Sequence, residues 1–65
     1  MNQRIFYKQN RRIICYIDIT AERIAVRTGK PSDPCCLSWY YDPNDLDTAK
    51  KTAQSYYEQY TRPLM

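Results

Sequence analysis

The side chains of this 65-residue chain that could do chemistry are three cysteines, three serines and a group of aspartates. The chain has no histidine, which removes the usual general base near neutral pH and the commonest metal ligand. Without a neighbouring base, a serine hydroxyl or a cysteine thiol is not activated as a nucleophile. The sequence therefore predicts a protein that is not an enzyme and that holds no metal and no cofactor.

The cysteines are Cys15 and the adjacent pair Cys35 and Cys36. Small secreted disulfide scaffolds usually contain four, six or eight cysteines, so this odd set predicts reduced thiols in the cytoplasm. A zinc site would be one ligand short unless a carboxylate completed it. No run of residues reaches the roughly 18 apolar positions that cross a bilayer, and we expect no membrane association.

Asp42, Asp45 and Asp47 are close enough in sequence to suggest paired carboxylates or a calcium loop. Their spacing lacks the glycine and the distal glutamate of an EF-hand. Asp42 followed by Pro43 is instead typical of a helix start, with the aspartate as N-cap and the proline at the first helical position. We therefore interpret these carboxylates as part of a helix N-terminus.

The cations are concentrated in the first half of the chain. Residues 1–30 hold seven Lys or Arg and two acidic residues, whereas residues 31–65 hold three and five. The basic half also alternates in the manner of β-strands, so most of its cations are expected on one side of a sheet. Such a surface favours an anionic partner.

Four short segments are rich in β-branched and aromatic residues and alternate with period two. They are residues 4–8, 12–19, 23–28 and 35–41. Apolar residues at three- and four-residue spacing then predict a helix over residues 43–60. We expect the α+β class and one small domain over residues 1–65, with two layers. An antiparallel sheet of three to four strands would pack on one C-terminal helix.

The segment 35–41 has a second interpretation, as an extended stretch that packs on the sheet without pairing to it. The third strand would then keep an open edge, through which two copies could associate. Monomer and homodimer are therefore both compatible with the sequence.

The two faces of the predicted sheet differ in chemistry. The face toward the helix is apolar and comprises Ile5, Tyr7, Ile13, Cys15, Ile17, Ile19, Ile24, Val26, Leu37 and Trp39. The opposite face has no second helix to cover it, and it interleaves five cations with aromatic and aliphatic side chains. Its candidate binding residues are Arg4, Phe6, Lys8, Arg12, Ile14, Tyr16, Arg23 and Arg27.

Two functions from different classes use this face. The first is a small accessory or regulatory protein that binds nucleic acid, because cations contact phosphates and aromatic rings stack on unpaired bases. A three-stranded sheet can also lie in the major groove of DNA, where arginine reads guanine edges.

The second is a small protein-binding module or inhibitor, of phage or mobile-element type. It would use Phe6, Ile14 and Tyr16 as apolar anchors within a basic rim. A third interpretation is an ordinary solvated face, on which Arg and Lys discourage aggregation.

Three antiparallel strands followed by a helix, with arginines on the strands and an acidic helix start, resemble two families. These are the small DNA-binding domains of the AP2 type and the arm-binding domains of tyrosine recombinases. The matching positions are Arg12, Tyr16, Arg23 and Arg27 on the strands and residues 47–51 (Asp-Thr-Ala-Lys-Lys) in the helix. The resemblance implies DNA binding through the sheet. The chain lacks the glycines that those turns often carry, and residues 35–41 have no clear counterpart.

Overall fold

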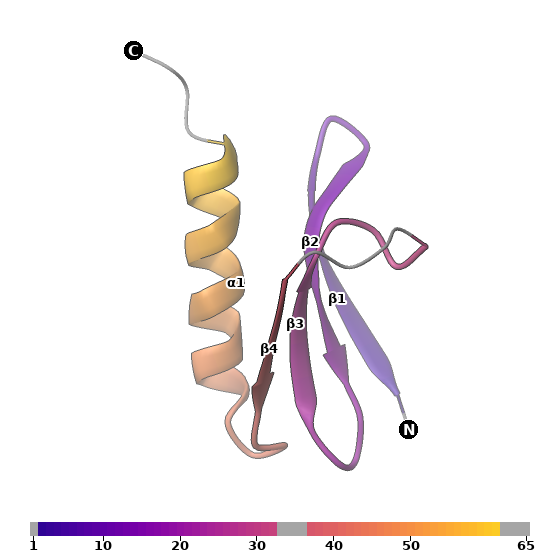
Figure 1. The fold of residues 1–65 in the computed structure, drawn as a ribbon, viewed down its shortest axis with the longest axis vertical. Helices are drawn as coiled ribbons and strands as arrows, with labels where there is room; N and C mark the ends of the chain where they lie inside the picture. The colour runs from indigo at the N-terminus through magenta and orange to yellow at the C-terminus, as the bar shows by residue number, and fades with distance from the viewer. Residues whose placement is uncertain (1, 33–36, 62–65) are drawn as a thin grey trace.

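A computed structural model describes residues 2–32 and 37–61. One antiparallel sheet contains four strands in the order of the chain: β1 (Gln3–Gln9), β2 (Arg12–Ile19), β3 (Ile24–Thr28) and β4 (Ser38–Tyr41). Helix α1 (Leu46–Thr61) lies along one face of this sheet (Figure 1). The predicted α+β class, with an antiparallel sheet packed on one C-terminal helix, is confirmed.

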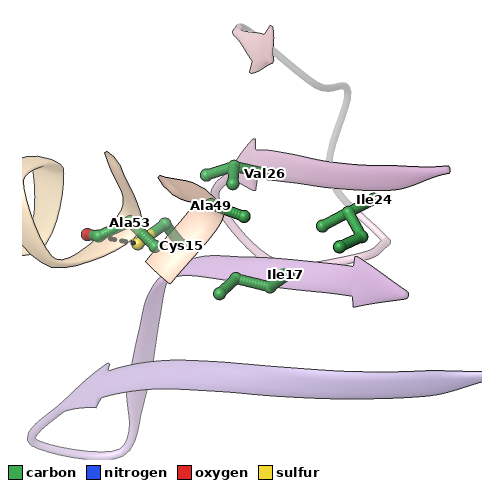
Figure 2. Close-up of a cluster of buried hydrophobic side chains, with 6 residues drawn as sticks. All are labelled: Cys15, Ile17, Ile24, Val26, Ala49 and Ala53. Carbon is green, nitrogen blue, oxygen red and sulfur yellow. Dashed lines mark hydrogen bonds between the residues drawn. The ribbon is translucent and has the colours of Figure 1, made fainter. Parts of the chain in front are cut away.

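The core lies between α1 and the two central strands. It contains six fully buried side chains, Cys15, Ile17, Ile24, Val26, Ala49 and Ala53 (Figure 2). The two alanines are the residues that α1 presents to the sheet at full burial, and their small size lets the helix approach closely. The thiol of Cys15 donates a hydrogen bond to the carbonyl oxygen of Ala53 at 3.5 Å. Half-buried aromatic side chains surround this centre, among them Tyr7, Trp39, Tyr41, Tyr56 and Tyr57.

The first hairpin turns at Asn10 and Arg11, which have φ values of 52° and 69°. Because Gln9 pairs with Arg12, the loop has two residues, and two positive φ values are those of a type I′ turn. Asparagine tolerates this region, but arginine there brings its Cβ close to the following carbonyl oxygen. Glycine is the usual second residue of such a turn, so the backbone at Arg11 is strained.

A β-bulge interrupts the alternation of β2. Tyr7 pairs with Cys15, but the next residue, Lys8, pairs with Ile13, so Ile14 is an extra residue on β2. One extra residue shifts every side chain beyond it to the other face of the sheet. Arg12 and Ile13, which precede the bulge, therefore lie on the opposite faces from those predicted. Ile13 is the cross-strand partner of Lys8, so its predicted place on the helix side is wrong.

Strand β4 is shorter than the segment predicted for it. Leu37 is 51% exposed, so it does not add a buried side chain to the apolar face, as had been expected of it. Its backbone N–H donates to the hydroxyl of Thr28 at 3.3 Å, and its carbonyl accepts from the Thr28 amide at 3.2 Å. Regular pairing begins only at Ser38. For Ser38–Tyr41 the interpretation as an unpaired segment is also wrong. The expected positions of residues 35–36 lie outside the described residues.

Helix α1 begins later than predicted, and Asp42 is not its N-cap. The amide of Asp45 donates to the carbonyl of Asp42 at 2.9 Å, and the amide of Asn44 donates to the Asp42 carboxylate at 2.9 Å. These bonds form a β-turn over residues 42–45. The carbonyl of Asp45 then accepts the first helical bond, from Ala49. Pro43 suits the second position of a turn as well as a helix start, because both need a φ of about −65°.

Replacing Ala53 with leucine is expected to lower the free energy of unfolding by about 1–3 kcal/mol. The Ala53 side chain is fully buried against Cys15, and extra methyl groups in a closely packed contact force the two layers apart. Chemical denaturation measures this loss. Gln54→Leu places the same side chain at an exposed position of α1 and should change stability by less than about 0.5 kcal/mol. Equal losses in both variants would contradict the close contact.

Replacing Arg11 with glycine is expected to raise the free energy of unfolding by up to about 1 kcal/mol. Glycine lacks the Cβ that strains the backbone at a φ of 69°, although its freedom in the unfolded chain offsets part of the gain. Arg11→Ala is the matched control, because it removes the same charge but retains the Cβ. A glycine variant no more stable than the alanine variant in thermal unfolding would argue against strain at this turn.

Candidate nucleic-acid interface

The face of the sheet opposite α1 presents two rows of side chains that run across the strands. One row contains Phe6, Tyr16, Arg27 and Ser38, and the other contains Arg4, Asp18, Ala25 and Tyr40. Neighbours within a row are direct cross-strand partners, about 5 Å apart. We call these two rows, together with Lys8 and Arg23, the open face.

Every aromatic ring of the open face has a cation above it. The pairs are Arg4 with Tyr16, Lys8 with Phe6, and both Arg23 and Arg27 with Tyr40, at 4.4–5.9 Å from the cation to the ring centre. A cation in this position is attracted by the negative face of the ring. The four cations, which come from β1, from β3 and from the residue before β3, are therefore held at defined places over rings of β1, β2 and β4.

The side chains predicted to form an apolar centre opposite the helix are more buried than expected. Ile14 and Tyr16 are only 5% and 6% exposed, whereas Phe6 and Tyr40 are 41% and 52% exposed. Arg4 lies over the ring of Tyr16 and helps to cover it. The prediction of an exposed apolar centre at Ile14 and Tyr16 is therefore wrong, and the exposed rings lie toward the two edge strands.

Arg12 does not belong to the open face, because the bulge in β2 reverses its direction. Its Nη2 donates a hydrogen bond to the hydroxyl of Tyr60 on α1 at 3.3 Å, and its guanidinium lies 5.9 Å from the centre of the same ring. The prediction that Arg12 shares a surface with Arg23 and Arg27 is wrong. Arg23 and Arg27 do lie together, since both contact Tyr40.

Tyr40 is a candidate binding residue that the sequence analysis missed. Alternation through residues 35–41 assigns Trp39 and Tyr41 to the helix side, so Tyr40 has to point to the other side. The signal was therefore present in the period-two pattern.

A hollow of about 330 Å³ opens in the open face beside the connection from β2 to β3. Its lining residues are Asn2, Asp18, Thr20, Glu22, Arg23, Ala25 and Arg27. Carboxylates that accept hydrogen bonds and guanidinium groups that donate them therefore meet in one place. Arg4 pairs with Asp18 at 3.6 Å. Arg27, which lines the hollow, has a buried Nε with no hydrogen-bond partner among the described residues, which is an unsatisfied donor.

The chemistry of Cys15 is that of a core residue. Burial raises the pKa of the Cys15 thiol to about 11, because the thiolate would lose its hydration. Burial also raises the pKa of Tyr7, with a further contribution from the neighbouring Cys15. Both groups are uncharged at neutral pH, so Cys15 is not a reactive nucleophile. Cys35 and Cys36 lie outside the described residues.

No family model, no curated protein and no solved structure matches this chain. Within residues 2–32 and 37–61, no three His, Cys, Asp or Glu side chains come together in a way that could hold a metal ion. The helical part of those residues contains no stretch long and apolar enough to cross a membrane. A function for the open face therefore has to be inferred from its own geometry and charge.

The free energy of unfolding is expected to fall as the pH rises from about 9 to about 11. The unfolded chain releases the Cys15 proton near the ordinary pKa of 9.0, whereas the folded chain retains it up to a pKa of about 11. In that window the folded state binds more protons, so the stability present below pH 9 is lost as the pH rises.

Urea denaturation at pH 8, 9, 10 and 11 measures this loss in a variant with Cys35→Ser and Cys36→Ser, which retains Cys15 as its only thiol. The matched control adds Cys15→Ala and should lose less stability over the same range. The same decline in both proteins would show that Cys15 is not its source.

Proposed function

We propose that this protein is a non-enzymatic accessory or regulatory protein that binds single-stranded nucleic acid through the open face. The observation that carries the proposal is the combination of exposed rings with cations held above them. Phe6 and Tyr40 are each partly exposed, and each lies under at least one cation. Unpaired strands are bound by this combination, since bases stack on aromatic rings and cations follow the phosphates.

The positions of the two exposed rings suit a strand that crosses the sheet. Phe6 is on β1 and Tyr40 is on β4, at opposite edges of the sheet. Three interstrand spacings separate them, about 15 Å. A nucleic-acid strand that crosses the sheet from β1 to β4 would stack one base at each edge, with its phosphates near the cations of the open face.

The hollow beside Tyr40 suits the edge of a stacked base. Arg23 and Arg27 line the hollow and also contact the Tyr40 ring. The edges of bases carry both donors and acceptors of hydrogen bonds. Asp18 would accept from a base amino group, and Arg27 would donate to a ring nitrogen or a carbonyl oxygen.

The alternative, a protein-binding module or inhibitor of phage or mobile-element type, depends on an apolar centre. Protein interfaces concentrate their binding energy in desolvated central residues. Of the three proposed anchors, Ile14 and Tyr16 are buried and only Phe6 is substantially exposed. The open face therefore suits a nucleic acid better than a protein partner. The odd, sparse set of cysteines favours the cytoplasm as the place of action, as part of the same proposal.

Binding to a labelled single strand is expected to weaken steeply with salt. Four cations that contact phosphates give a slope of about −2.8 in log K against log salt. The affinity should therefore fall about 50-fold between 50 and 200 mM salt in a fluorescence anisotropy titration. A complex that ignores salt over this range would count against phosphate contacts, and no binding to any single strand would overturn the proposal.

Substitutions on the open face are expected to weaken binding more than the same change of charge elsewhere. Lys8→Gln with Arg23→Gln removes two open-face cations, and we expect an affinity loss of at least about 10-fold. The matched control, Lys50→Gln with Lys51→Gln, removes two exposed cations from α1 and should change affinity much less. Equal losses would show that binding follows net charge alone.

The exposed rings are expected to contribute through stacking. Phe6→Ala and Tyr40→Ala should each cost about 1–3 kcal/mol of binding free energy. Tyr40→Phe retains the ring and should bind almost as tightly as the unaltered chain. Circular dichroism of each variant checks that the sheet is intact. If both alanine variants bind normally, the rings do not stack on bases.

A further inference from the structure

A second hollow, of about 410 Å³, lies at the end of the β1–β2 hairpin. It is lined by Arg11, Arg12, Ile13 and Lys30, and we call it the tip hollow. The charged groups among these four described residues are three cations. The hollow of the open face, by contrast, contains acids and bases together. The tip hollow therefore favours an anion on charge alone.

The backbone at the tip hollow keeps a charged side chain where glycine would be less strained. Arg11 has a φ of 69° at the second position of a type I′ turn, where glycine is the usual residue. Strained residues of this kind cluster at binding sites, because the side chain is needed at that point. The strain is an observation independent of the charge, and it points to the same residue.

Two further contacts hold the cations of the tip hollow in place. The guanidinium of Arg12 donates a hydrogen bond to the hydroxyl of Tyr60 at 3.3 Å, so its position is set before any ligand binds. Gly29, the residue before Lys30, donates its amide to the carbonyl of Ile14 at 2.9 Å. This bond ties the segment after β3 to β2 and brings Lys30 to the hollow. Cations positioned in advance bind with less loss of conformational freedom.

The number of cations indicates the kind of anion. A phosphate monoester carries a charge of about −1.5 to −2 and three strong acceptor oxygens, whereas each phosphodiester within a strand carries one negative charge. Arg11 and Arg12 alone bring two positive charges to this hollow, which match the monoester, and arginine pairs well with phosphate oxygens. We propose that the tip hollow binds the terminal phosphate of a nucleic acid strand.

The tip hollow is next to the open face. Lys8 of the open face is the cross-strand partner of Ile13, which lines the tip hollow. A nucleic-acid strand with a base stacked on Phe6 and a phosphate near Lys8 would therefore need to extend only a short way to reach the tip hollow. This inference rests on the proposed function, and it adds that the protein recognises strand ends.

The test compares three oligonucleotides of one sequence, with a 5′-phosphate, with a 3′-phosphate, or with hydroxyl groups at both ends. We expect a phosphate at one of the two ends to lower the Kd of the full chain at least about 10-fold. Inorganic phosphate should compete away this gain and leave the hydroxyl-ended strand bound. Arg11→Gly, which is expected to fold with greater stability, and Lys30→Gln should each abolish the gain. Lys50→Gln, which removes one exposed cation of α1, should retain it.

The outcomes separate this inference from the proposed function. If the hydroxyl-ended strand binds but neither phosphate adds affinity, the tip hollow is not a phosphate site and the open-face proposal is unaffected. A gain that persists in Arg11→Gly and Lys30→Gln has the same meaning. If no oligonucleotide binds, the open-face proposal fails. An NMR titration with inorganic phosphate alone then decides whether the tip hollow binds phosphate. Shifts at the amides of Arg11 and Lys30 would support a site for free phosphate, and unmoved amides would overturn it.

Discussion

The close contact between α1 and the two central strands is the interaction on which the rest of the structure depends. Ala49 and Ala53 are fully buried there, and the Ala53 carbonyl accepts a hydrogen bond from Cys15. A chain of this size buries only about 60% of the surface that it exposes when unfolded. The fully buried core is accordingly confined to the helix side, and the open face has to be covered by its own side chains.

On the open face, long basic side chains serve as that cover. Arginine and lysine can lay their aliphatic stems along a ring while their charged groups stay in water. Arg4 over Tyr16 is the clearest case, because Tyr16 is only 6% exposed although α1 packs on the other face of the sheet. The same side chains thus shield the sheet and display positive charge. A substitution that retains the stem, such as glutamine, separates these two roles better than alanine does.

Features set by local pattern could be predicted from the sequence. The bounds of β2 agree with the prediction, because Cys15, Ile17 and Ile19 alternate with Tyr16 and Asp18 over most of its length. The start of α1 was misjudged, because Asp42 and Pro43 suit a turn as well as a helix. These signals are local, and tertiary contacts decide between the two structures.

The bulge in β2 could not be predicted for a different reason. Ile13 and Ile14 are both apolar, so the hydrophobic pattern is unchanged whichever of them is the extra residue. The face on which Arg12 lies depends on whether the strand contains an extra residue, so the predicted face of Arg12 was wrong as well. The sequence also could not show that Phe6 is exposed and Tyr16 is buried, because both are aromatic and they are cross-strand partners on one face of the sheet. Which of them is covered depends on where the side chain of Arg4 lies.

The bulge also explains how one hairpin supplies cations to two surfaces. Lys8 remains on the open face, while Arg12, across the hairpin, turns toward α1. Two tyrosines of α1 hold this arrangement: Tyr57 donates to the carbonyl of Lys8 at 3.0 Å, and Tyr60 accepts from Arg12. These tyrosines are about one turn apart on the helix, so the end of α1 braces both strands where their pairing is irregular. The helix that forms the core thereby also sets where the cations of the hairpin end lie.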